Sequence, residues 1–555
     1  MTQPTDPVSP LGEAAEPTTP AGNVLSSAQL VAAGILLSRI AGFARDVVFA
    51  NYFGTSQYAS AFRGALRMPN VLQNLLGEGT LSASFIPVYS QLIERGDREA
   101  AGRLAGTVFS LLLAIAGGLA LFGVLLAPVL VSVFLPGFSD KPELHELTIT
   151  CARIIFPMTG LLVLSAWALG VLNSHRQFFV SYTAPVLWNA AMIAVLVLFG
   201  SRLDQRNLVI ALAWGALLGG ALQFLVQLPW VFRLERSLRP GWNLQSPHVR
   251  TVLRNATPAI MGRGVVQLSG WVDMALASFL FTGAVGAIGY AQTLYMLPVS
   301  LFGMSIAAAE LPEMSRTSSD DTEPLRRRIA AALRQMAVFV VPAVAGYLVL
   351  GDIIVGAMYE RGDFVRGDTV LVYLILAGYS MGLLASTASR LYSSSFYALH
   401  DTRTPARIAF LRVIVSAVCG GLLMVALEPV RIFGTTIGFG DGVILGGRPI
   451  GAAGLAAGTA LGAWLEWTLL RRALARRIGA PAAGSVLLRL GLAALLAAAL
   501  ARALLSVLPP MPVIAAAAGA LGVFASAYFA LAHLFRVEEV RAALRRITRR
   551  LRPRP

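Results

Sequence analysis

Long apolar runs separated by short polar segments dominate the chain from residue 25 to residue 535. A helix needs ~18–20 apolar residues to cross ~30 Å of hydrocarbon, and the runs reach that length repeatedly. They predict fourteen membrane-spanning helices, at residues 25–50, 60–93, 104–134, 146–173, 178–200, 208–232, 252–282, 286–314, 329–358, 369–399, 406–427, 450–470, 484–508 and 512–535. Potential breaks lie inside the second and eighth ranges, at Pro69, Gly77, Gly79, Pro298 and Pro312.

The composition agrees with an all-α integral membrane protein. Of the 555 residues, 56% are hydrophobic and only 13% are charged, whereas about 25% of a soluble domain is charged. The net charge of +16 does not indicate a nucleic-acid partner, because the arginines lie in short loops between apolar runs. A single lysine, Lys141, excludes a GxxxxGK phosphate loop, and Cys151 and Cys419 lie in separate apolar runs that offer no metal site.

Loop charge predicts the topology. Arginines concentrate in the loops after even-numbered helices, for example Arg95, Arg176, Arg236, Arg326, Arg403 and Arg471. The positive-inside rule therefore places both termini in the cytoplasm. The first 22 residues contain no basic residue, which indicates a disordered tail rather than a signal peptide.

The C-terminal tail carries an apolar stripe among many arginines, formed by Val540, Leu544, Ile547 and Leu551. This pattern is typical of an amphipathic helix that lies on the anionic inner leaflet. A frayed basic tail is the alternative that the residues leave open.

The first two predicted helices carry charges where a membrane span should have none. At helical spacing, one stripe of the second helix is formed by Arg63, Arg67, Asn70, Asn74 and Glu78. Arg39, Arg45 and Asp46 lie in the first helix, and Arg39 is about twelve residues, or roughly 18 Å, from its start. A central charge costs at least ~2.5–3.5 kcal/mol unless it faces a wet cavity or a partner. The charges therefore predict a polar, net cationic cavity; snorkelling of the arginines to an interface is the alternative.

The chain also repeats itself. The pairs Gly215 and Gly458, Gly219 and Gly462, His175 and His400, and Pro87 and Pro312 stand at similar places in the two halves. An even number of helices separates them, so the halves would insert with the same orientation, as in transporters with parallel repeats. Chance similarity between apolar helices is the alternative.

This organisation predicts five segments. They are a cytoplasmic N-terminal tail at 1–23, an N-lobe at 24–237, a C-lobe at 238–480, a final helix pair at 481–536 and a basic C-terminal tail at 537–555.

The first two predicted helices form a helical pair that we call the first hairpin. Its motifs resemble the MurJ (MviN) family of lipid II flippases, in the MOP exporter superfamily. The residues that carry the resemblance are SRIAGFARD at 38–46, RMPN at 67–70, GEG at 77–79 and FIPVYS at 85–90. The resemblance runs from about residue 24 to residue 536. It implies a multi-pass protein of the bacterial inner membrane with fourteen helices, a cationic cavity between two six-helix lobes, and a groove for a polyprenyl tail in the last two helices. The family's cavity charges fall on Arg39, Arg45, Asp46, Arg67 and Glu78.

Some positions depart from the family pattern. Gln73 and Ser60 stand where well-studied members have charged residues, and Thr293 and Met296 replace a frequent arginine–glutamate pair. We expect Arg63 or Arg263 to compensate; a structural salt bridge is the alternative for Arg263 and for Asp273. Glu310, Arg390 and Glu466 are further intramembrane charges, with either a cavity role or a helix-to-helix contact.

The predicted substrate-binding residues are therefore Arg39, Arg45, Asp46, Arg63, Arg67, Asn70, Asn74, Glu78 and Arg263. Arginine suits a pyrophosphate because its planar fork makes bidentate, always-charged hydrogen bonds. We expect a monomeric flippase, without cofactor, that moves lipid II by alternating access; the resemblance implies undecaprenyl-pyrophosphate-linked disaccharide-pentapeptide as its substrate.

The alternative is a MOP-type exporter of another polyprenyl-linked glycan. A drug exporter would need net acidic cavity residues, and a glycosyltransferase would need catalytic carboxylates or histidines on a large outer loop. The largest such loop, 428–449, offers only Glu428, Arg431, Asp441 and Arg448 among glycines. The sequence therefore does not favour an enzyme.

The topology can be tested with a reporter that is active only in the periplasm, fused to the C-terminus. The loop arginines predict that this fusion stays inactive, because the last residue remains in the cytoplasm. A fusion to the loop at 428–449 is the positive control. An active C-terminal fusion would contradict the topology.

Overall fold

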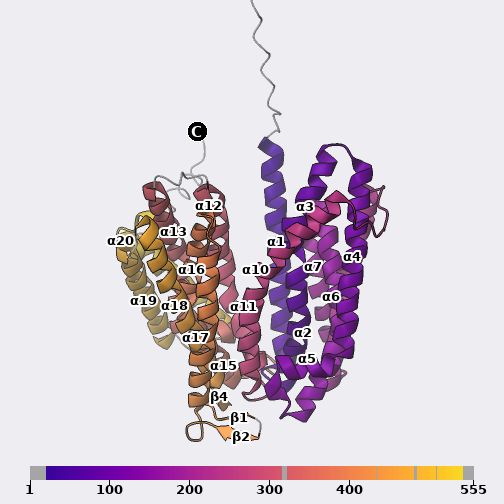
Figure 1. Ribbon diagram of the computed structural model, residues 1–555. Helices are drawn as coiled ribbons and strands as arrows, with labels where there is room; N and C mark the ends of the chain where they lie inside the picture. The colour runs from indigo at the N-terminus through magenta and orange to yellow at the C-terminus, as the bar shows by residue number, and fades with distance from the viewer. Residues whose placement is uncertain are drawn as a thin grey trace, which may run out of the picture.

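The computed structural model describes residues 21–315, 322–432, 434–479, 484–507, 509 and 511–541. Two helical bundles stand side by side in it, and α10 (Pro247–Ser278) runs obliquely between them (Figure 1). The predicted N-terminal tail up to residue 20 and the basic tail from residue 542 lie outside the described residues. The first helix begins at Ala21, inside the segment predicted as tail.

The first bundle contains the elements before α10. They are α1 (Ala21–Phe53), α2 (Gln57–Leu76), α3 (Glu78–Glu94), α4 (Arg98–Leu125), α5 (Ala127–Phe134), η1 (Pro136–Phe138), α6 (Pro142–Ser174), α7 (Phe178–Phe199), α8 (Gln205–Leu225) and α9 (Leu228–Leu234). Side-chain oxygens cap two of these helices, because Ser56 accepts from the Ala59 amide and Asp97 from the Ala100 amide.

The second bundle contains the elements after α10. They are α11 (Ala284–Pro298), η2 (Val299–Met304), α12 (Ser305–Ser315), α13 (Thr322–Val349), α14 (Gly351–Tyr359), α15 (Arg366–Ser380), α16 (Leu383–Ala398), α17 (Arg403–Leu427), α18 (Gly451–Ile478), α19 (Gly484–Val507) and α20 (Val513–Leu534). Two small antiparallel hairpins follow α17, formed by β1 (Val430–Ile432) with β2 (Thr435–Ile437) and by β3 (Ile444–Leu445) with β4 (Arg448–Pro449). We call the end of the molecule that carries them the hairpin end (Figure 1).

Every predicted span falls on one helix or on consecutive helices. The second breaks at Gly77, and the eighth passes into the π-helical turn η2 directly after Pro298, as those residues predicted. In the described residues, nine helices are long and apolar enough to cross a membrane, or ten if α15 and α16, bent by 40°, form one span. The all-α membrane fold is thus confirmed, while the count of fourteen stays a prediction.

The paired glycines have the same packing role in the two halves. A Cβ at Gly215 or Gly219 of α8 would lie 2.7 or 2.9 Å from atoms of α7. A Cβ at Gly458 or Gly462 of α18 would lie 2.2 or 1.9 Å from atoms of α17. Glycine therefore permits the close approach of α8 to α7 and of α18 to α17.

The turns before α7 and α17 also have the same backbone shape. In the structure His400 corresponds to Arg176, one residue after the His175 with which the sequence pairs it. The left-handed residues are Arg176 and His400, each with a φ of +59°. Arg536 closes α20 with a φ of +57°. At each turn the following amide bonds back to the last turn of the helix, as in a Schellman motif.

Hydrogen bonds join the two bundles at the hairpin end. The Thr55 hydroxyl donates to Asp368 over 2.5 Å, and the Asp363 amide donates to the Asn51 carbonyl over 2.9 Å. Asp368 is fully buried and also forms a 2.8 Å ion pair with Arg448 of β4. These contacts close the space between the bundles at this end.

Lys141 holds the end of α10 against the first bundle. Its Nζ donates to the carbonyls of Ser278, over 2.9 Å, and Leu280. Burial lowers the pKa of Lys141 to about 8, although the nearby Glu428 carboxylate opposes the shift. Glu428 in turn accepts from the Phe281 amide over 2.7 Å, so both charged groups fix the connection between α10 and α11.

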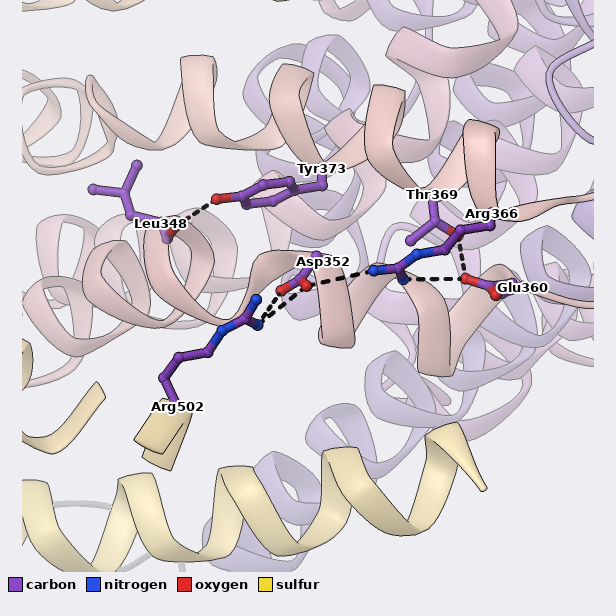
Figure 2. Close-up of polar contacts among 7 residues, drawn as sticks. All are labelled: Leu348, Asp352, Glu360, Arg366, Thr369, Tyr373 and Arg502. Carbon is purple, nitrogen blue, oxygen red and sulfur yellow. Dashed lines mark hydrogen bonds and ion pairs between the residues drawn. The ribbon is translucent and has the colours of Figure 1, made fainter. Parts of the chain in front are cut away.

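The final helix pair, α19 and α20, packs on the outer side of the second bundle (Figure 1). Arg502 of α19 donates to both oxygens of Asp352 in α14, over 2.9 and 3.1 Å. Figure 2 shows Arg366 of α15 approaching the same carboxylate, at 3.6 Å. One acidic side chain therefore ties α19 to two helices of the bundle.

Beyond α20, Val537 and Val540 are buried against α13, α19 and α20. Glu539 forms a 2.6 Å ion pair with Arg334 of α13. The start of the tail therefore packs on protein, so placing Val540 in a stripe that lies on the membrane surface is wrong. The rest of that stripe lies outside the described residues.

The Asp352–Arg502 pair predicts a modest stability effect. Arg502→Gln should lower the free energy of unfolding by about 1 kcal/mol, because the pair is only partly exposed and Arg366 remains beside Asp352. Thermal unfolding in nanodiscs measures the change. Arg489→Gln, at an exposed arginine of α19 with no ion pair among the described residues, is the control. An equal loss in both variants would contradict the assignment.

Candidate functional site

Helices α1 and α2 bring two arginines onto one buried carboxylate. Arg45 Nη2 lies 2.8 Å from Asp46 Oδ1, and Arg63 Nη2 lies 3.9 Å from the same oxygen. Asp46 Oδ2 accepts a 2.8 Å hydrogen bond from the Thr293 hydroxyl of α11. Asp46 is only 5% exposed. One carboxylate thus faces two arginines, and the cluster keeps a net positive charge.

The Arg63 guanidinium lies against the rings of Tyr290 and Phe49, which we call its aromatic seat. Its guanidinium carbon is 4.4 Å from the ring centre of Tyr290 and 5.2 Å from that of Phe49, which is a cation–π arrangement. Gly289 leaves space for the guanidinium, since a Cβ at this position would lie 2.4 Å from Arg63 Nη1. Nε and Nη2 are buried without a hydrogen-bond partner among the described residues. Asp46 and the two rings therefore hold a guanidinium with unused donors.

Arg67, one turn further along α2, faces α10. A Cβ at Gly270 would lie 2.1 Å from Arg67 Nη2, so glycine lets the guanidinium lie against α10 without shifting. Asp273 and Tyr379 are close enough to interact electrostatically with the guanidinium. Its buried Nε has no hydrogen-bond partner in the described part of the chain.

Arg39 and Arg45 are the more accessible arginines of α1. Arg39 is exposed and donates to the Ser300 hydroxyl in η2, which links the two bundles at a second level. The Arg45 guanidinium lies 5.1 Å from the ring centre of Trp188 in α7, and its side chain is 20% exposed. A cavity of about 30 Å³, room for about one water molecule, adjoins Arg45, Asp46 and Arg63.

The predicted stripe on the second helix is interrupted before its last member. α2 ends at Leu76, and Glu78 is the first residue of α3. One continuous helical face from Arg63 to Glu78 is therefore wrong, because Gly77 adopts a ψ of −149° that ends the helix. Asn70 is half-buried, Asn74 lies 3.5 Å from Gln267 of α10, and Glu78 is exposed and interacts electrostatically with Tyr182.

Two of the positions that depart from the family pattern form hydrogen bonds between helices. The Ser60 hydroxyl accepts from the Gly286 amide over 3.0 Å, which joins α2 to α11. Thr293 bonds to Asp46, and Met296 is 48% exposed. Arg263 belongs to α10, but its side chain lies outside the described residues.

The second bundle contributes charges of its own. Arg412 of α17 forms a 2.8 Å ion pair with Glu466 of α18, which is 7% exposed. Asp273 of α10 interacts electrostatically with both Arg412 and Arg67, so it connects this pair to the first hairpin. Glu310 pairs instead with Arg328 over 2.7 Å, as a contact between α12 and α13.

Sequence reasoning missed Arg412 and the aromatic seat. Arg412 lies inside the apolar run at 406–427 and carries the same signal as Arg39, a charge at membrane depth. Tyr290 and Gly289 gave no such signal, because aromatic and small residues are ordinary in apolar helices.

The chain matches the family model described as lipid II flippase MurJ over residues 49–512. It is 32% identical to the probable lipid II flippase MurJ of Rhizobium tropici over 402 residues, which are 72% of this chain and 75% of that protein. It is also 32% identical to the lipid II flippase MurJ of Burkholderia cenocepacia over 399 residues, 71% of this chain and 77% of that protein.

Solved structures give the same fold. A lipid II flippase MurJ in an inward closed conformation superposes with a TM-score of 0.70 at 23% identity and covers 91% of this chain and 98% of its own. An inward-facing multidrug resistance MATE transporter of the MOP superfamily gives 0.61 at 16% identity, over 80% of this chain and 94% of its own. With most of the chain matched by the family model and by these relatives, this chain belongs to the MurJ lipid II flippase family.

Proposed function

We propose that this chain moves lipid II from the inner to the outer leaflet of the bacterial inner membrane by alternating access. The observation that carries the proposal is the cationic first hairpin. Arg39, Arg45, Arg63 and Arg67 all come from α1 and α2, and Asp46 is the one carboxylate within ion-pair distance of any of them among the described residues. The excess positive charge suits a pyrophosphate, because the guanidinium fork binds its oxygens bidentately.

The contacts that join the two bundles at one end support entry of the head group from the cytoplasm. One group of the hydrogen bonds between them lies at the hairpin end, around Thr55, Asp363 and Asp368. The loop charges predict that this end lies outside the cell. Outward opening would then require the Thr55–Asp368 bond to break while the opposite ends approach each other.

The polyprenyl tail would stay beside the final helix pair. A cavity of about 700 Å³ lies between the end of α13 and α19, and its walls are mostly apolar, formed by Val349, Ala499, Arg502, Ala503, Leu505 and Ser506. Transport would need no nucleotide. Outward movement of an anionic head group runs with an inside-negative potential, which contributes ~2.3 kcal/mol per charge per 100 mV.

The anion site can be tested with Arg39→Ala, Arg45→Ala and Arg67→Ala in cells depleted of their resident flippase. Loss of one charge-assisted hydrogen bond removes ~1.5–3 kcal/mol of binding, so each variant should translocate far less lipid II. Membrane protein levels should stay normal. Arg407→Ala, on the exposed face of α17, is the control. Normal translocation by all three variants would refute the site, and a parent chain that moves no lipid II would favour another polyprenyl-pyrophosphate glycan.

Arg63 and Arg263 are the proposed compensating cations. Arg63→Ala should reduce lipid II translocation, since Asp46 loses one of its two arginines and the freed carboxylate repels the pyrophosphate. Arg63→Lys should retain part of the activity because it keeps the charge. Arg263→Ala tests the other candidate in the same assay. If neither alanine variant is impaired, the compensation is disproved.

A further inference from the structure

Arg390 is an intramembrane arginine without a carboxylate. It is the eighth residue of the sixteen-residue helix α16, and its side chain is exposed. It forms no ion pair and no hydrogen bond among the described residues, and it interacts electrostatically with Tyr295, Arg412 and Glu466. The Glu466 carboxylate is already engaged by Arg412. A charge at this depth is costly unless it faces water or a ligand.

Three other helices place groups near Arg390, which supports a position facing the protein: Tyr295 of α11, Arg412 of α17 and Glu466 of α18 all lie within electrostatic reach of its guanidinium. Its neighbours Ser389 and Leu391 are 2% and 0% exposed, and Ser386, one turn earlier, is 5% exposed. α16 packs against α12, α13 and α18. The exposed Arg390 side chain therefore borders space among these helices.

Two tyrosines connect Arg390 to the first hairpin. Tyr295, beside Arg390, lies 5.5 Å ring to ring from Tyr379. Tyr379 in turn lies within electrostatic reach of Arg67. Arg390 therefore stands on the second bundle's side of the same interior region that Arg67 borders from the first.

The helix that faces the first hairpin brings no cation of its own. In α11 the Thr293 hydroxyl is engaged by Asp46, and Met296 is exposed but neutral. Arg412 is neutralised by Glu466 at 2.8 Å. Arg390 is thus left as the second bundle's available guanidinium near the site, as far as the described side chains go.

We propose that Arg390 is a second anion-binding residue of the transport site and binds an oxyanion of the lipid-linked head group. The oxyanion is a phosphate oxygen or a carboxylate of the attached peptide, two sources with the same chemistry. The proposal rests on the proposed function and extends it, because it makes each bundle contribute its own cationic contact to one bound substrate.

The experiment measures binding of two probes, lipid II and undecaprenyl pyrophosphate, to the purified full chain in nanodiscs. Arg390→Gln should weaken lipid II binding roughly 10- to 100-fold, the effect of one lost charge-assisted hydrogen bond. An equal loss for both probes assigns a phosphate oxygen to Arg390. A loss for lipid II alone assigns a peptide carboxylate.

Arg407→Gln is the matched control. Arg407 begins the exposed face of α17 that continues through Phe410, Ile414 and Val418, and so it points away from the bundle interior. This variant should bind both probes as the parent does. Arg390→Met, which keeps the apolar stem, replaces Arg390→Gln if the latter does not fold.

Parental affinity for both probes in a folded Arg390 variant would overturn the proposal. If Arg67→Ala weakens binding in the same assay, the proposed function stands and only the role of Arg390 is lost. If the parent binds neither probe, the proposed function falls, and this inference falls with it.

Discussion

The rest of the structure depends on holding guanidinium groups at membrane depth without neutralising them. A fully paired arginine would be cheap to bury but would have nothing left for a ligand. Arg63 is only partly paired. One shared carboxylate and two aromatic faces stabilise its charge, while Nε and Nη2 have no hydrogen-bond acceptor among the described residues. Glycines at positions 270 and 289 leave space for these guanidinium groups, since a Cβ at either position would force the arginine side chain to move.

The contacts between the two bundles fall into two groups, one at the hairpin end and one nearer the middle of the helices. At the hairpin end, buried Asp368 bonds to Thr55 and Arg448, and backbone groups of Asn51 and Asp363 meet. Closer to the middle of the helices, the links pass through the proposed substrate region, as with Thr293 to Asp46 and Arg39 to Ser300. A ligand that competes for these central groups would weaken the contacts between the bundles while leaving each bundle intact.

Hydropathy was enough to locate the helices, because each crossing needs a long apolar run whatever its neighbours are. The charged first hairpin also predicted Arg45, Asp46 and Arg63 together, since a membrane penalises stray charges. The sequence could not predict the seat of Arg63, because Tyr290 and Phe49 are distant in the chain and ordinary in composition. It also could not show that Val540 packs on α13 and α19 instead of the lipid surface, since both environments select an apolar residue. The break at Gly77 was foreseen, but its consequence for Glu78 was not.

The left-handed turns at Arg176, His400 and Arg536 bear on how the chain enters the membrane. Glycine would adopt this backbone freely, whereas other residues bear a strain of ~1–2 kcal/mol. Each turn ends a helix on the side opposite the hairpins, which the loop charges predict to be the side that positive charge retains during insertion. Glycine at residues 176 and 536 would relax the folded backbone but remove two of the arginines from which the cytoplasmic side of these loops is predicted. On the predicted topology, these turns keep a small permanent strain in the folded backbone in exchange for the positive charges that direct insertion.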